Sequence, residues 1–75
     1  MLTVGSIIEC NRTGIEFVVS HDKNSVGYYN LYTLVGNQSL VLARNTIEGI
    51  VYHMCTDGYK IIGHVNDYKE NNSNA

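Results

Sequence analysis

The chain lacks any long hydrophobic run, and this absence limits where it can act. A membrane-spanning helix needs about 20 consecutive apolar residues, and no stretch of the 75 residues approaches that length. Residues 1–5 also lack the basic start and apolar run that open a signal peptide. We therefore expect a soluble protein that makes no membrane contact and works in the cytoplasm.

Cysteine is scarce as well. The two cysteines, Cys10 and Cys55, could form one bridge. However, Cys10 lies in a strand pattern and Cys55 lies on the apolar edge of a helical pattern, where a free cysteine acts as a small buried hydrophobe. Because cytoplasmic thiols are kept reduced, we expect two buried thiols in preference to a disulfide.

Positive charge is also limited. Five basic residues stand against seven acidic ones, which gives a net charge of −2. Unspecific binding to nucleic acid draws most of its free energy from lysines and arginines placed against phosphates. The charge balance therefore argues against a general DNA or RNA binder, although a basic patch assembled by the fold stays open.

Strand patterns fill most of the chain. Segments that alternate in polarity or are rich in β-forming residues occur at 3–10, 15–21, 28–35, 38–44 and 59–65. Turn residues separate the first four segments, with Gly14 closing one turn and Gly36-Asn37 forming a two-residue hairpin turn. Residues 66–75 are polar and without period. We therefore predict one domain over 1–65 followed by a flexible tail at 66–75.

One segment, at about 46–56, has the pattern of a helix. Its apolar residues recur at helical spacing: Ile47, Ile50, Val51, Met54 and Cys55. Asn45 and Glu48 can form a capping box at its start, and Gly58 can end it in a left-handed conformation. A complete apolar stripe indicates that this helix plugs an open side of the sheet.

The predicted order is four strands, one helix and a final strand. Short turns favour an antiparallel meander, and the helix can carry the chain to the other edge of the sheet, where 59–65 pairs with 3–10. The predicted fold class is mostly β (α+β), with a five-stranded, strongly curved antiparallel sheet or partial barrel. Over residues 3–65 this topology resembles the small SH3-like barrels, including the Tudor and KOW-type modules.

No catalytic or metal-binding pattern stands out. The cysteines and histidines lack the spacing of a known nucleophilic site. His53 and Asp57 lie four residues apart and could hold one metal ion, but a helix C-terminus explains both, because Asp57 precedes the exit glycine and His53 suits the helix dipole. We therefore expect neither an enzyme nor a protein that holds a metal or cofactor.

Tyrosine is the unusual abundance, with six residues against one phenylalanine and no tryptophan. Tyrosine and asparagine offer rigid contact area and hydrogen bonds at low entropy cost. We predict a partner-binding surface from one face of strand 28–35 and the polar side of the helix: Tyr28, Asn30, Tyr32, Glu48, Tyr52 and His53. The alternative is that these tyrosines are ordinary, half-buried strand residues.

The small size, mild acidity and asparagine-rich, proline-free composition resemble the accessory proteins of bacteriophages and mobile elements. This resemblance implies an inhibitor or adaptor that blocks a host defence protein in the host cytoplasm. The alternative is an SH3-like barrel that binds nucleic acid or a nucleotide through Tyr28, Tyr32 and Tyr52 with Arg44 or Lys60. In either case, strand edges on so small a core favour a homodimer.

Overall fold

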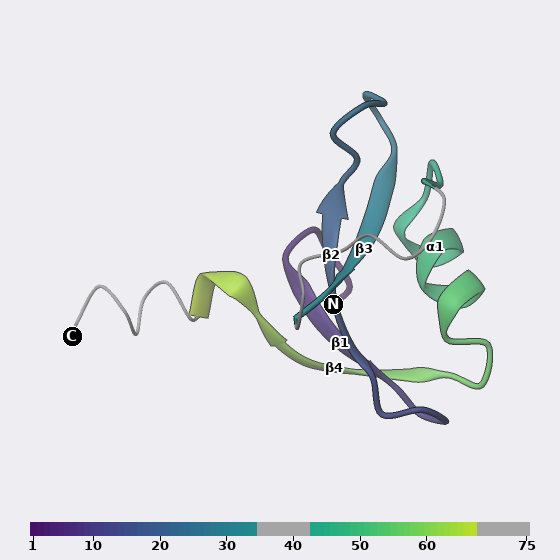
Figure 1. Cartoon of the computed structure of the whole chain (residues 1–75). Helices are drawn as coiled ribbons and strands as arrows, with labels where there is room; N and C mark the ends of the chain where they lie inside the picture. Colours follow the sequence, from purple (N-terminus) through teal and green to yellow (C-terminus); the bar gives the residue numbers. More distant parts are fainter. Residues whose placement is uncertain (35–42, 68–75) are drawn as a thin grey trace.

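The computed structural model describes residues 1–34 and 43–67, and Figure 1 shows their arrangement. Its elements are β1 (Ser6–Cys10), β2 (Glu16–His21), β3 (Tyr29–Thr33), α1 (Ile47–Met54) and β4 (Tyr59–His64). The strands form one antiparallel sheet in the order β3-β2-β1-β4. The described part of the chain is therefore mostly β, with an open four-stranded sheet and one helix.

The first hairpin follows its turn chemistry. The backbone N–H of Gly14 donates to the carbonyl of Cys10 at 2.9 Å, and the N–H of Cys10 donates to the carbonyl of Ile15 at 3.1 Å. Gly14 has φ +72°, a conformation that glycine adopts without steric cost. The resulting register places Ile8 opposite Phe17. The hairpin predicted from the sequence is confirmed.

The pairing of the first and last strands is confirmed as well. β4 runs antiparallel to β1, with Cys10 opposite Tyr59 and Ile8 opposite Ile61. The register shifts between Ile7 and Ile8, which is the mark of a β-bulge. The helix therefore does carry the chain from the β3 side of the sheet to the free side of β1.

Two predictions fall largely outside the described residues. The strand predicted at 38–44 is described only at its end, where Arg44 and Tyr29 form an antiparallel backbone pair. The N–H of Tyr29 donates to Arg44 at 2.7 Å, and the N–H of Arg44 donates back at 3.1 Å. Only residues 66 and 67 of the tail predicted at 66–75 are described, and they belong to a helical turn at 65–67. A five-stranded sheet and a flexible tail stay predictions.

The core lies between the sheet and the helix. Its fully buried side chains come from β1, β2, β3 and α1: Ile8, Phe17, Val19, Leu31, Ile50 and Val51. Ile50 and Val51 belong to the apolar stripe predicted from the sequence, and burying each contributes roughly 2 kcal/mol of transfer free energy. The helix therefore does cover the sheet, as its stripe indicated.

That cover does not reach β4. Tyr59 and Ile61 lie opposite Cys10 and Ile8, on the face of the sheet that carries the core, but they are 38% and 42% exposed. α1 makes more contacts with β3, at the other edge of the sheet, than with any other strand. β4 therefore presents these two side chains on the core face, as the alternation in residues 59–65 predicts, but they stay partly exposed because one short helix covers only part of the sheet.

The prediction of two free thiols is also wrong. Cys10 and Cys55 form a disulfide across a Cα–Cα distance of 5.1 Å. Each residue is buried, as its apolar setting suggested, but pairing of β1 with β4 places both at the same end of the core. Disulfides persist in oxidising compartments, so the bridge does not support the cytoplasmic location from which free thiols were expected. No described helix has the length and apolar character needed to span a membrane.

The bridge should supply much of the stability of so small a domain. It links residues separated by 45 positions, for which the chain-entropy relation gives about 4 kcal/mol. We expect the double substitution Cys10→Ala with Cys55→Ala to lower the free energy of unfolding by about this amount in urea titrations. Wild-type protein under full reduction is the matched control and should unfold at a similar urea concentration. A loss below about 1 kcal/mol would contradict this entropic role.

Candidate functional site

The strand residues of the predicted surface have different environments. Tyr28 is exposed and precedes β3, whereas Tyr32 is half-buried opposite Val18. Asn30 is only 6% exposed, and its side-chain amide donates to the Asp22 carboxylate at 2.5 Å. Asn30 therefore helps to fix the loop between β2 and β3, which makes it a poor contact residue for a partner.

The helix residues of the predicted surface are all exposed. Glu48, Tyr52 and His53 lie on the side of α1 away from buried Ile50 and Val51. Tyr52 is 71% exposed, more than any other tyrosine in the described chain. A large aromatic side chain in this position buries little of its surface in the core, so most of that surface is free to contact another molecule.

The structure divides the predicted surface into two groups. Leu31 lies in the core between the sheet and α1. Successive side chains along a strand point to opposite faces of the sheet. Asn30 and Tyr32 therefore lie on the sheet face opposite the helix. The described residues do not bring this strand group together with the helix group around Tyr52.

Arg44 extends the helix group. Its guanidinium Nη2 lies 3.5 Å from Nδ1 of His53, and its backbone is held by the pair with Tyr29. The sequence suggested Arg44 only as a nucleic-acid contact, because residue spacing does not reveal its contact with the helix. We call the set of Arg44, Glu48, Tyr52 and His53 the α1 outer surface.

The start of α1 differs from the predicted capping box. Thr46, not Asn45, is the N-cap, and its hydroxyl accepts a hydrogen bond from the backbone N–H of Gly49 at 3.0 Å. The predicted helix at about 46–56 is shorter, because it ends at Met54 with Cys55 as its C-cap. Thr46 takes the N-cap position in place of Asn45 because its side chain reaches the third N–H of the helix.

The same hydroxyl explains a glycine inside the helix. A Cβ atom added to Gly49 would lie 2.6 Å from Oγ1 of Thr46. This contact is too short, so alanine at this position would displace the capping hydroxyl. The cap therefore accounts for a glycine that otherwise costs about 1 kcal/mol in a helix.

His53 and Asp57 do not share a helix face. Asp57 lies in the turn beyond α1, where its carboxylate is 3.4 Å from the Arg12 guanidinium, while His53 contacts Arg44. In residues 1–34 and 43–67 there is no group of three or more histidine, cysteine or acidic side chains placed to hold a metal.

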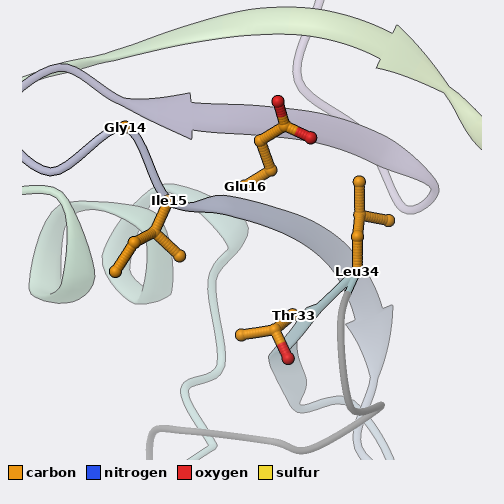
Figure 2. A pocket seen from close by; sticks show the side chains of 5 residues that line it. All are labelled: Gly14, Ile15, Glu16, Thr33 and Leu34. Carbon is orange, nitrogen blue, oxygen red and sulfur yellow. The ribbon is translucent and has the colours of Figure 1, made fainter.

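An open depression of about 320 Å³ lies where β2 begins and β3 ends. Figure 2 shows its lining residues, with Glu16 and Leu34 pointing to one side of the strand pair and Ile15 and Thr33 to the other; Gly14 completes the lining. Glu16 supplies the one carboxylate of this lining. A single carboxylate among mostly apolar walls defines no reaction.

Comparisons with protein-family models, with curated proteins and with solved structures find no match to this chain. The candidate site therefore depends on the geometry of the α1 outer surface alone.

The capping geometry predicts a coupling between Thr46 and Gly49. Thr46→Ala should destabilise the domain by about 1 kcal/mol through loss of the cap. Gly49→Ala should stabilise it by about 1 kcal/mol in the Thr46→Ala background, where the hydroxyl is gone, but should have almost no net effect in the wild type. Urea unfolding of the four proteins measures this cycle. Thr46→Ser, which keeps the hydroxyl, is the control, and equal effects of Gly49→Ala in both backgrounds would refute the explanation.

Proposed function

We propose that this chain is a non-enzymatic binding module whose α1 outer surface contacts a protein partner. The observation that carries the proposal is Tyr52, a tyrosine 71% exposed on a helix that is anchored at both ends. Tyrosine is enriched among the residues that dominate binding free energy at protein interfaces. Its two side-chain torsions cost little entropy to fix.

The anchoring of α1 supports this proposal. Thr46 caps the first turn, Ile50 and Val51 hold the middle in the core, and the Cys55 disulfide holds the end. A surface that is already ordered loses little conformational freedom on binding, and this raises affinity. An eight-residue helix would be unstable without such anchors.

The charges of the α1 outer surface favour a protein over nucleic acid. Glu48 is acidic and Arg44 is basic, so the surface presents both signs. Nucleic-acid backbones are instead bound by surfaces with several cations. Lys60, the other cation of the alternative proposal, lies on β4, at the opposite edge of the described sheet from β3. A nucleic-acid or nucleotide site therefore remains the second proposal.

The resemblance in composition to phage accessory proteins makes a host protein the proposed partner, with the chain acting as an inhibitor or adaptor. Self-association is a compatible proposal. Ile61 and Ile62 are exposed on β4, and an edge strand with exposed apolar side chains can pair with another chain.

We also propose the SH3-like, five-stranded sheet as the complete fold. The pair between Tyr29 and Arg44 supports it, because a two-residue turn at Gly36-Asn37 places residue 29 opposite residue 44. The observed pair thus has the register that the predicted hairpin requires. A strand at 38–44 would then lie beside β3.

This register can be tested by nuclear magnetic resonance. Because Tyr29 and Arg44 exchange both backbone hydrogen bonds, the positions between such pairs bring Hα atoms close together. We expect an Hα–Hα Overhauser effect between Tyr32 and Val41. The described pair of Glu9 and Glu16 serves as the positive control. A contact from Tyr32 to residue 40 or 42 instead would show a slipped register and contradict the proposed hairpin.

The α1 outer surface can be tested with Tyr52→Ala. We expect this substitution to weaken partner binding about 30-fold, the effect of a hot-spot residue, and to change the free energy of unfolding by less than about 0.5 kcal/mol. The tagged full chain would capture the partner from host lysate, and calorimetry with the purified partner would give the affinities.

Tyr59→Ala is the matched control, since it removes a tyrosine of β4 and should leave binding unchanged. If Tyr28→Ala and Tyr32→Ala weaken binding while Tyr52→Ala does not, the strand group is the site and the α1 outer surface is not. Binding to oligonucleotides that falls steeply with salt would favour the nucleic-acid proposal instead.

A further inference from the structure

The Cys10–Cys55 bridge lies between two exposed turns. One is the β1–β2 turn at 11–14, and the other is the turn at 55–58 that joins α1 to β4. Each cysteine is 4% exposed, and a small crevice of about 20 Å³ runs beside the bridge. Its lining combines both turns with the end of the helix: Cys10, Arg12, Thr13, Met54, Cys55, Thr56, Asp57 and Gly58. The bridge is therefore buried, but close to the protein surface.

Weak contacts hold the two turns together above the bridge. The Arg12 guanidinium and the Asp57 carboxylate are 3.4 Å apart, but their side chains are 75% and 59% exposed. The Asn11 side chain adds a hydrogen bond of 3.4 Å to the Asp57 carbonyl. Exposed ion pairs stabilise little, so these contacts can separate while the core stays folded. The backbone N–H of Asn11 also donates to the carbonyl of Gly58 at 2.9 Å, just before β4 begins.

We infer that the Cys10–Cys55 bridge is a redox site that a dithiol can reduce in the folded protein through this crevice, releasing the C-terminal end of α1. A thiolate of the dithiol attacks one sulfur, forms a mixed disulfide and expels the other cysteine as a thiolate. The second thiol of the dithiol then resolves the mixed disulfide and closes the reductant into its own disulfide. Two electrons and two protons pass to the protein, which ends with two thiols.

Reduction acts on the surface proposed for binding. Cys55 is the C-cap of α1, and its N–H donates to the carbonyl of Val51 at 2.8 Å. The strands hold one another through backbone ladders, whereas the described contacts of the helix body with the sheet are made by side chains. Losing the covalent attachment therefore loosens the last helical turn, which carries Tyr52 and His53. This effect on binding rests on the proposed function, but the chemistry of the bridge does not.

Reduction kinetics of the full oxidised chain test the inference without any partner. With dithiothreitol as the probe, the rate should rise linearly with reductant concentration and should stay unchanged at urea concentrations below the unfolding transition, because attack occurs in the folded state. A rate that levels off at the unfolding rate, measured separately in urea, would show that only the unfolded chain is reduced and would overturn the inference.

Two charge-matched variants test the crevice. Asp57→Asn removes the ion pair above the bridge and should speed reduction about two- to fivefold. Asp67→Asn makes the same change of charge near the far end of β4 and should leave the rate unchanged. Equal acceleration in both variants would indicate a general effect of net charge and would refute the crevice route.

Amide hydrogen exchange tests the consequence for α1. After reduction, amides at 50–55 should lose their protection, while amides of the β1–β2 pair keep at least tenfold protection over an unfolded chain. Loss of protection in both regions would make the bridge a staple of the whole fold and would overturn the release of α1. Unchanged protection at 50–55 would overturn it too.

Discussion

The covalent bond between Cys10 and Cys55 is the constraint on which the arrangement of sheet and helix depends. A domain of 75 residues buries only about 60% of the surface that its unfolded chain exposes. The helix adds just two fully buried side chains, Ile50 and Val51, to the core. The bridge closes the chain at the point where β1, α1 and β4 meet, so it supports a core too small to position the helix by packing alone.

The limited reach of α1 explains the distribution of exposed apolar residues. The helix makes more contacts with β3 than with any other strand, and the core beneath it is fully buried. On β4, farther from the helix, Tyr59, Ile61 and Ile62 remain exposed. The described molecule is thus well packed at one side of the sheet and open at the other. Its binding proposals concern the outer side of the helix and the edge strand, the places where side chains are not engaged by the core.

Local sequence patterns predicted those features that depend on neighbouring residues. The first hairpin followed from the turn ending at Gly14, and the buried stripe of α1 followed from its helical spacing. The pairing of β1 with β4 followed from a chain-level argument, since the helix was the connection long enough to cross the sheet. For these features the prediction agrees with the structure, because turn chemistry, periodicity and topology all favour the same fold.

The features that failed depend on distances between remote residues. The disulfide required Cys10 and Cys55 to meet at one end of the core, which no spacing in the sequence reveals. The choice of Thr46 over Asn45 as the cap depends on a one-residue shift of the helix start. Of the predicted surface, the helix residues are exposed, but Asn30 is occupied by Asp22. The alternating pattern placed Asn30 on a face and could not show that a loop carboxylate would reach it.

The pairing of β1 with β4 also governs when the fold can form. β1 ends at Cys10 and β4 begins at Tyr59, so these partners lie almost at opposite ends of the described chain. Contacts of such long sequence separation raise the contact order and slow folding, because a long loop must close before they form. During synthesis, β1 has no partner on this side until nearly the whole domain has been made. The antiparallel unit of β1, β2 and β3 is the part of the sheet that can assemble early. It exposes one edge of β1 to other nascent chains until β4 arrives.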